Sequence, residues 1–230
     1  MNKGALRFYN KIRSKGISPK KVCEVGVYLP EESNLIGFIN DNVDTTLIEA
    51  DPDYVIAINK YFAGSSNLTV HNAAVYDYNG TVELCKRKSS TFVSELKSSP
   101  AIVNDKYVID DGDKFIAKSI KFSEIDNGDF DVLSIDIEGA EWFVIKHLVS
   151  RPLILSIETH GKYYKNPYLK EISNWINENG YKIWYKDKSD TVFVKNDAFN
   201  ITIFEKLELI ITEMKLYIFS QKKYLKAIFK

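Results

Sequence analysis

The chain has 230 residues, of which 45% are hydrophobic, so its length suits one α/β domain with additional segments. Its 31 Lys and Arg against 31 Asp and Glu leave no net charge, which argues against a nucleic-acid partner held by bulk electrostatics. Cys23 and Cys85 lack metal or disulfide spacing, and no signal peptide or membrane-spanning run is found, a combination typical of a cytoplasmic protein.

Apolar runs alternate with helical patterns along the first third of the chain. A short amphipathic helix is predicted over residues 6–15, within an N-terminal helical segment of residues 1–19. Strands are predicted over residues 21–27, 45–50 and 68–72, with a short helix over 35–40. Asp51 as N-cap and Pro52 at the first helical position predict another helix after the second strand.

The middle and end of the chain continue the alternation. Asn79-Gly80 lies between two alternating runs and predicts a β-hairpin. Residues 87–113 are polar with weak periodicity, which favours a mobile or substrate-specific region. Further strands are predicted over 116–120, from Asp131 onward, and over 153–158, 181–185 and 191–195, with a helix over 168–179. This order predicts βαβ units and a doubly wound, mostly parallel seven-stranded sheet with helices on both faces.

The segment DVLSIDIEGAEW, residues 131–142, brings three carboxylates to the end of a mostly β-branched strand. They are Asp136, Glu138 and Glu141, and the next strand ends in Glu158-Thr159-His160. Ligands of open α/β sheets bind outside the carboxyl ends of strands, where adjacent strands are about 4.8 Å apart. These side chains can therefore converge on one reacting atom or metal, although Glu141 also suits the N-terminus of a helix.

Two positions on the earlier strands predict a nucleotide-like ligand at the same edge. Gly26 ends the first strand and would let the backbone approach a ligand closely. Glu49 ends the second strand 23 residues later, where an acid accepts hydrogen bonds from ribose hydroxyls. Gly26 also fits an ordinary tight turn, and Glu49 a surface acid.

The chain resembles S-adenosylmethionine-dependent methyltransferases of the FkbM family over roughly residues 20–195. The resemblance is carried by EVGVY (24–28), LIEADP (47–52), LTVHNAAVYDYNGTVEL (68–84), FDVLSIDIEGAEWFVI (130–145) and ILSIETH (154–160). The family usually shows D-x-G-A-N-x-G in its first motif, whereas Glu24 replaces the Asp here and Tyr28 stands at the Asn. The resemblance implies a class I, Rossmann-like methyltransferase domain over residues 20–198.

The resemblance also implies which positions hold the cofactor. Glu24 and Gly26 would flank its methionine end, and Glu49 would hold the ribose hydroxyls. Residues 50–51 and 72–74 would lie beside the adenine, and Asp136 would face the sulfonium and the acceptor hydroxyl. The implied cofactor-binding residues are Glu24, Gly26, Tyr28, Glu49, Ala50, Asp51, Asn72, Ala73, Ala74 and Asp136.

The expected reaction is transfer of a methyl group to a hydroxyl, which benefits from a base that removes the proton. Asp136 is the first candidate for this base, or for a metal ligand that acidifies the hydroxyl, and His160 is the second. Glu138 and Glu158 complete the predicted catalytic set. A divalent cation held by Asp136, Glu158 or His160 is a further hypothesis, and the sequence leaves the metal and metal-free versions open.

The predicted acceptor is the hydroxyl of a sugar, in a glycan or a nucleotide-linked sugar, because the family is often associated with polysaccharide decoration. Tyr163, Tyr164 and Tyr168 could stack on sugar rings or anchor their loop. A lipid or polyketide hydroxyl is the nearest alternative, and a non-catalytic binding module is another. A nicotinamide-dependent oxidoreductase is disfavoured because no GxGxxG follows Val25.

Residues 199–230 are predicted to form an amphipathic, basic C-terminal helix. Apolar residues recur there at spacings of four and three, with six Lys and three Glu from Ile201 onward. The seam is Ile203, Leu207, Ile210, Met214, Tyr217, Gln221, Tyr224 and Ile228, broken only by the glutamine. Three hypotheses remain open: the helix packs on the domain, forms a homo-oligomer contact, or lies on an anionic membrane as a peripheral anchor.

Overall fold

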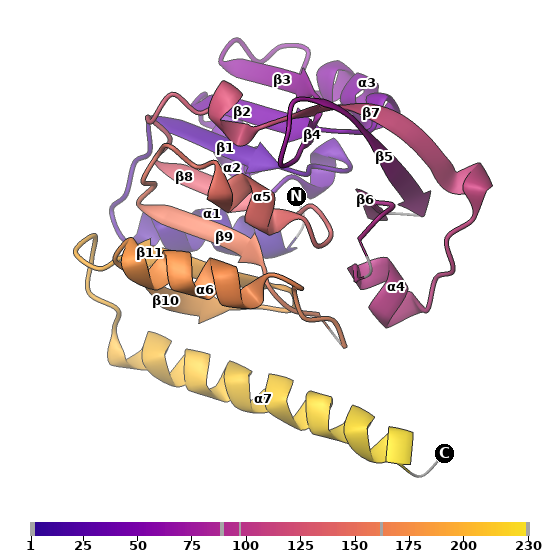
Figure 1. Ribbon diagram of the computed structural model, residues 1–230. Helices are drawn as coiled ribbons and strands as arrows, with labels where there is room; N and C mark the ends of the chain where they lie inside the picture. The colour runs from indigo at the N-terminus through magenta and orange to yellow at the C-terminus, as the bar shows by residue number, and fades with distance from the viewer. Residues whose placement is uncertain (1–2, 88–89, 97, 162, 229–230) are drawn as a thin grey trace.

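The computed structural model describes residues 3–87, 90–96, 98–161 and 163–228, and its centre is a seven-stranded sheet (Figure 1). The strand order is β10-β11-β9-β8-β1-β2-β3, in which β11 alone runs antiparallel to the other six strands. The strands are β1 Lys21–Val25, β2 Asp44–Glu49, β3 Leu68–Asn72, β8 Val132–Ile135, β9 Ile154–Glu158, β10 Tyr181–Lys186 and β11 Asp190–Lys195. The predicted mostly parallel sheet is confirmed.

Both faces of this sheet are buried, because successive strand residues alternate between two cores. On β1, Val22 packs against α1 (Lys3–Ser14) and α2 (Ile36–Asn40), whereas Cys23 packs toward α5 (Glu141–Lys146) and α6 (Leu169–Glu178). The first face continues over β2 to α3 (Pro52–Tyr61), where Leu47 meets Ile58. Helices therefore cover both faces, as the uninterrupted apolar strands predicted.

A second sheet has the order β4-β7-β5-β6, which the sequence did not predict. Its strands are β4 Ala74–Val75, β5 Gly80–Arg87, β6 Ser90–Val93 and β7 Lys114–Ile120. The predicted hairpin at Asn79-Gly80 is wrong, because β7 lies between β4 and β5. Gly80 is the first residue of β5 and pairs with Ser119, while the Asn79 side chain accepts a hydrogen bond from the Lys121 amide.

The polar segment 87–113 carries more regular structure than its composition indicated. Besides β6 it contains α4, Pro100–Asp105, whose N-cap Ser99 accepts a hydrogen bond from the Ile102 amide at 3.3 Å. Three 3-10 turns complete the fold: η1 Pro30–Glu32, η2 Asp111–Asp113 and η3 Phe122–Glu124. Whether the segment is mobile or decides substrate choice stays a prediction.

The two terminal helices both pack on the main sheet. Phe8 and Ile12 of α1 join the core beneath Trp184, and α7, Ile203–Ile228, lies along the β10 edge (Figure 1). None of the described helices is long and apolar enough to cross a membrane. The domain division at residues 19 and 198 stays a prediction. Both cysteines are buried and free.

Gly26 should be the glycine of this fold that tolerates a side chain least. It has φ +84°, and a Cβ there would lie 1.8 Å from the backbone oxygen of Asp136. Gly26→Ala must therefore push β1 and β8 apart, and we expect it to lower the unfolding free energy by more than about 3 kcal/mol. Urea unfolding followed by circular dichroism measures the change.

Gly16→Ala is the matched control. Gly16 has φ +73°, yet nothing lies within 4 Å of its added Cβ. Gly16→Ala should lower the unfolding free energy by only about 1–2 kcal/mol, because alanine is strained in a left-handed backbone conformation. If both variants lost the same unfolding free energy, close packing of β1 on β8 would not be what requires glycine at position 26.

Candidate active site

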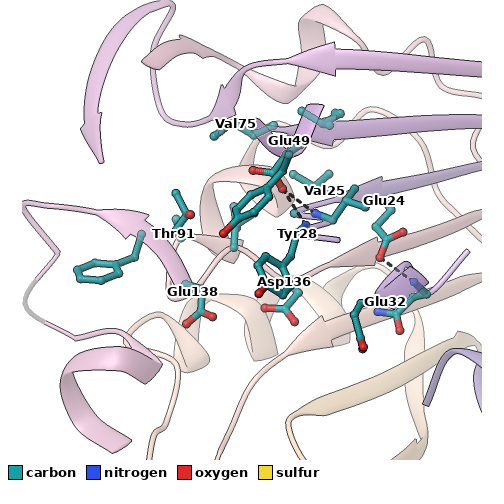
Figure 2. A pocket seen from close by; sticks show the side chains of 18 of the residues that line it. Glu24, Val25, Tyr28, Glu32, Glu49, Val75, Thr91, Asp136 and Glu138 are labelled. Atoms are coloured by element: carbon teal, nitrogen blue, oxygen red, sulfur yellow. Dashed lines mark hydrogen bonds between the residues drawn. The ribbon is translucent and has the colours of Figure 1, made fainter. Parts of the chain in front are cut away.

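A cavity of about 740 Å³ opens at the carboxyl ends of the parallel strands. Figure 2 shows Glu49, Tyr28, Asp136 and Glu138 around this hollow. The second sheet contributes to its wall through Leu84 of β5 and through residues 91–93 of β6. The volume lies in the usual range for small-molecule and cofactor sites.

The first strand end forms a tight loop around Gly26 in the cavity wall. The Gly26 amide donates to the Ile48 carbonyl at 2.9 Å, and the Asp136 amide donates to the Val25 carbonyl at 2.9 Å. Glu24 turns its carboxylate toward the next loop, where it accepts from the Ser33 hydroxyl and the Asn34 amide. Burial raises the pKa of Glu24 to about 7. All these contacts hold the loop, and Glu24 and Gly26 both line the cavity.

Glu49 fixes the same loop from the end of β2. One oxygen accepts from the amides of Val27 and Tyr28, both at 3.0 Å (Figure 2). The other accepts from the Asp51 amide at 2.9 Å. Burial raises the pKa of Glu49, against these hydrogen bonds. A carboxylate has about four acceptor positions, so one remains for a ribose hydroxyl. The bonds also hold Tyr28 at φ +61°.

Of the residues expected beside the adenine, the structure places some in the cavity wall and others outside it. Ala50, Ala73 and Ala74 line the cavity. Asp51 is buried behind it, where it caps α3 by accepting from Asp53 and forms an ion pair with Lys86 at 2.6 Å. Asn72 is exposed and also lies outside the wall, and its side-chain amide donates to the carbonyls of Glu49 and Ala50. Asp51 and Asn72 therefore hold the turn between β2 and α3.

The carboxylates predicted on the later strands do converge. Asp136 and Glu138 line the cavity, and one oxygen of Asp136, Glu141 and Glu158 lies within 4.8 Å of the others. Burial, followed by repulsion from neighbouring acids, raises the pKa of Asp136 and of Glu158 well above the usual range. Burial raises the pKa of Glu138 to about 7. One oxygen of Glu138 and one of Glu158 have no hydrogen-bond partner among the described residues.

Glu141 has a structural place within this cluster. One oxygen accepts from the amides of Ile137 and Gly139, at 3.0 and 3.1 Å, and the other accepts from the Asn166 side chain. The side chain is fully buried and closes the loop that carries Asp136 and Glu138. Glu141 is therefore the residue that holds this loop.

His160 lies outside the cavity wall, and both its ring nitrogens are engaged. Nε2 faces the Asp187 carbonyl at 3.1 Å and must carry the proton, so Nδ1 accepts from the Thr159 hydroxyl at 2.9 Å. Burial lowers the pKa of His160. With no free lone pair, His160 is a poorer base than Asp136.

The donor set fits a divalent cation incompletely. The hypothesis named Asp136, Glu158 and His160, but Glu141 stands beside the first two in place of the histidine. Glu141 already accepts three N–H bonds, which leaves Asp136 and Glu158 as the free carboxylates. Two carboxylates fall short of the six or so oxygen ligands of a hard cation. These side chains therefore do not form a complete site for such a cation.

Among the wall residues that the sequence analysis missed, Asp190 and Tyr54 stand out. Asp190 opens the antiparallel strand β11, so it reaches the same edge as the ends of the parallel strands and pairs in register with Glu158. Burial raises its pKa to about 7, and it accepts from Ser189 and Ser156. Tyr54 lies on the first turn of α3 and packs edge-on against Tyr28 at 4.8 Å. Asp190 could have been found by noting that the last strand, if antiparallel, begins at the edge where the parallel strands end, so that its first polar residue reaches the site.

The predicted stacking tyrosines do not line the cavity. Tyr164 is 1% exposed, and Tyr168 packs against Phe143 with ring centroids 5.3 Å apart. Of the two interpretations of this segment, the structure favours anchoring of the loop over stacking on a sugar.

Comparison with known structures identifies the fold class of the protein. The fold is similar to that of a structure provisionally described as a caffeoyl-CoA O-methyltransferase from Staphylococcus aureus, with a TM-score of 0.51, 11% identity, and 85% of this chain and 84% of that chain covered. A structure provisionally described as an RNA methyltransferase from Pyrococcus horikoshii has a TM-score of 0.47, 11% identity, and coverage of 83% and 81%. No curated protein matches the chain significantly. The sheet order and the cavity at its edge define a class I, Rossmann-like methyltransferase fold.

The family follows from the sequence itself. Residues 24–183 match the model of the methyltransferase FkbM domain, which is more than half of the chain. The protein therefore belongs to the FkbM methyltransferase family, and it is an enzyme that uses S-adenosylmethionine as methyl donor. The nicotinamide hypothesis is thereby set aside.

The crowded carboxyls predict how stability depends on pH. A carboxyl whose pKa is raised by folding keeps its proton where the unfolded chain has lost it, so stability present at low pH is lost as the pH rises through the folded-state pKa. For Asp190 this window runs from about 4 to about 7. We expect the Tm of the ligand-free protein to fall by several degrees from pH 5 to pH 8. Within the window, each pH unit lowers the unfolding free energy by about 1.4 kcal/mol per carboxyl, which lowers the Tm by ~3 °C.

Asp190→Asn should reduce this slope, because it removes one of the titrating groups and keeps a hydrogen-bonding side chain. Glu171→Gln is the control, since Glu171 is exposed on α6 and should leave the slope unchanged. A Tm that rises from pH 5 to pH 8, or an Asp190→Asn slope equal to that of the wild type, would contradict the account.

Proposed function

We propose that the protein transfers the methyl group of S-adenosylmethionine to a hydroxyl oxygen of a sugar, in a glycan or a nucleotide-linked sugar. The observation that carries the hydroxyl assignment is Asp136 at the end of β8. Its carboxylate lines the cavity, and burial among acids raises its pKa well above the usual range. Such a group takes up a proton more readily than an ordinary aspartate, which is what methylation of a neutral hydroxyl requires.

In the proposed reaction the acceptor oxygen attacks the methyl carbon in line with the breaking S–CH3 bond. The hydroxyl proton passes to Asp136, the new O–CH3 bond forms, and the cofactor leaves as the neutral thioether S-adenosylhomocysteine. The positive sulfonium and the negative carboxylate disappear together. Because charges are costly in a desolvated site, this neutralisation favours the forward reaction. Most of the rate enhancement would come from positioning of the two reactants.

The cofactor would lie along the cavity wall between the ends of β2 and β8. Glu49 would hold the ribose hydroxyls with its remaining acceptor position, and Ala50, Tyr54 and Ala73 would border the adenine. The methionine end would lie by Gly26, where the absence of a side chain leaves the backbone accessible. The sulfonium would then face Asp136 and Glu138, whose negative charge complements it.

The wall chemistry supports a small polar acceptor over a nucleic acid. Seven acidic side chains line the cavity against two basic ones, Arg7 and Lys188. Phosphate backbones need the opposite balance. Thr91 and Ser189 add hydroxyls, which suit a sugar. The choice of a sugar also follows the family's frequent association with polysaccharide decoration.

A lipid or polyketide hydroxyl is the alternative acceptor, since the same base and donor would serve it. Leu84, Phe92 and Val93 give the cavity an apolar strip that could contact such a chain. A non-catalytic role is disfavoured because the cavity and the loop-fixing contacts of Glu49 are intact. Screening sugars and lipid or polyketide alcohols as acceptors with radiolabelled S-adenosylmethionine distinguishes the two acceptor classes.

Two substitutions should separate cofactor binding from chemistry. Glu49→Gln keeps the size of the side chain but weakens its bonds to the loop and ribose, so calorimetric affinity for S-adenosylhomocysteine should fall about tenfold or more. Asp136→Asn should bind S-adenosylhomocysteine within a few-fold of the wild type. With an acceptor found by the screen, its methyl transfer should fall by about 100-fold or more.

Glu171→Gln on α6 controls for a general effect of removing a carboxylate. Unchanged methyl transfer in Asp136→Asn would contradict its role as the base. Absence of S-adenosylhomocysteine binding to the wild type would contradict the cofactor site itself.

A further inference from the structure

The C-terminal helix α7 packs on the domain with its polar side. The partly buried residues of its described portion recur at three- and four-residue spacings: Glu205, Glu208, Leu209, Thr212 and Leu216. Glu205 accepts from Trp184 Nε1 at 2.8 Å and pairs with Lys15 at 2.7 Å, and Glu208 pairs with Arg7 and Lys11 of α1. This face is therefore fixed to the domain by charge.

The opposite side of α7 is apolar and faces solvent. Leu207, Ile210 and Met214 are 50%, 52% and 59% exposed, although they belong to the seam that one hypothesis placed against the domain. Phe204, Ile211 and Ile218 widen the strip. The helix does pack on the domain, but its described side chains do so through the other face and not through this seam. The later seam residues Gln221, Tyr224 and Ile228 have side chains outside the described residues.

The charges of α7 are divided between the two faces in a way that favours one kind of partner. The helix has three acids in all, and each is paired with the domain, Glu213 through Lys186 at 2.8 Å. Lys206 and Lys215 are exposed, and helical spacing places them on opposite borders of the apolar strip. Glu213 lies on the same border as Lys206, but its carboxylate is paired with Lys186 of the domain. The outward side thus combines apolar residues with two lysines, and each acid of the helix is paired with the domain.

We propose that this face of α7 binds an anionic phospholipid surface. An apolar strip bordered by lysines lies in the plane of a bilayer interface with its lysines at the headgroups. Over the 26 residues of Ile203–Ile228 the helix is about 39 Å long, enough for an extended contact. A second copy fits less well, because two such faces would bring lysines together with no acid left to pair with them.

Co-sedimentation with vesicles tests the proposal on the full chain. Vesicles of phosphatidylcholine and phosphatidylglycerol at equal parts should bind the protein about tenfold or more better than vesicles of phosphatidylcholine alone. Lys206→Gln with Lys215→Gln should lower binding by about tenfold or more, since each lysine near an anionic surface contributes about fivefold. Lys60→Gln with Lys170→Gln is the matched control and should have little effect.

The apolar strip has its own matched pair of variants. Leu207→Ser, Ile210→Ser and Met214→Ser combined should abolish sedimentation, whereas Ile56→Ser, Val108→Ser and Ile116→Ser remove three exposed apolar side chains elsewhere and should leave it intact. All six positions are exposed, so the Tm should stay near that of the wild type. Equal binding to both vesicle types, or unchanged binding of the α7 triple variant, would overturn the proposal. The proposal would also be overturned if the wild type did not bind vesicles but formed a concentration-dependent dimer that the α7 triple variant lost.

Discussion

Electrostatic repulsion among desolvated carboxyls is the constraint on which the rest of this site depends. Strands β8, β9 and β11 bring Asp136, Glu158 and Asp190 to one edge of the sheet, and burial raises the pKa of each. Among the described residues one oxygen of Glu158 has no partner at all. Such a group is stable only with shared protons or with a positive charge. The methyl donor of this family carries a positive charge on its sulfonium. During transfer the sulfonium loses this charge while the base takes up a proton, so that one positive and one negative charge disappear together.

The surrounding contacts keep this costly arrangement in place. Glu141 uses both its oxygens to bind backbone amides of the loop after β8 and the Asn166 side chain, so the loop cannot relax away from its neighbours. On the other side, Glu49 ties the loop after β1 to the end of β2. Gly26 allows the two loops to approach, since the Asp136 carbonyl occupies the place of a side chain. Two acids that appear functional in sequence therefore also have supporting roles, and they make the cavity rigid before any ligand binds.

Much of the main sheet could be predicted from sequence, because parallel strands buried on both faces have uninterrupted apolar runs such as the one before Asp136. The same logic brought Asp136 and Glu158 together correctly. The hairpin at Asn79-Gly80 failed because β7, distant in sequence, pairs with both segments that looked like neighbours. Asp190 was missed because its strand runs the other way, and His160 was overvalued because its bonds to Thr159 and Asp187 depend on tertiary contacts that no motif encodes. The face of α7 that packs on the domain was chosen by ion pairs across the fold, which a hydrophobic pattern does not reveal.

If the buried acids receive the positive charge of the sulfonium, ligand binding should release protons. Calorimetry at pH 7 in buffers of different ionisation enthalpy measures that release. S-adenosylmethionine and S-adenosylhomocysteine differ at the sulfur by one methyl group and one charge. We expect the charged donor to release more protons than the neutral product, because carboxyls with pKa values raised to about 7, such as Glu138 and Asp190, ionise when a cation arrives. Equal proton release for the two ligands would show that the acids do not respond to the sulfonium.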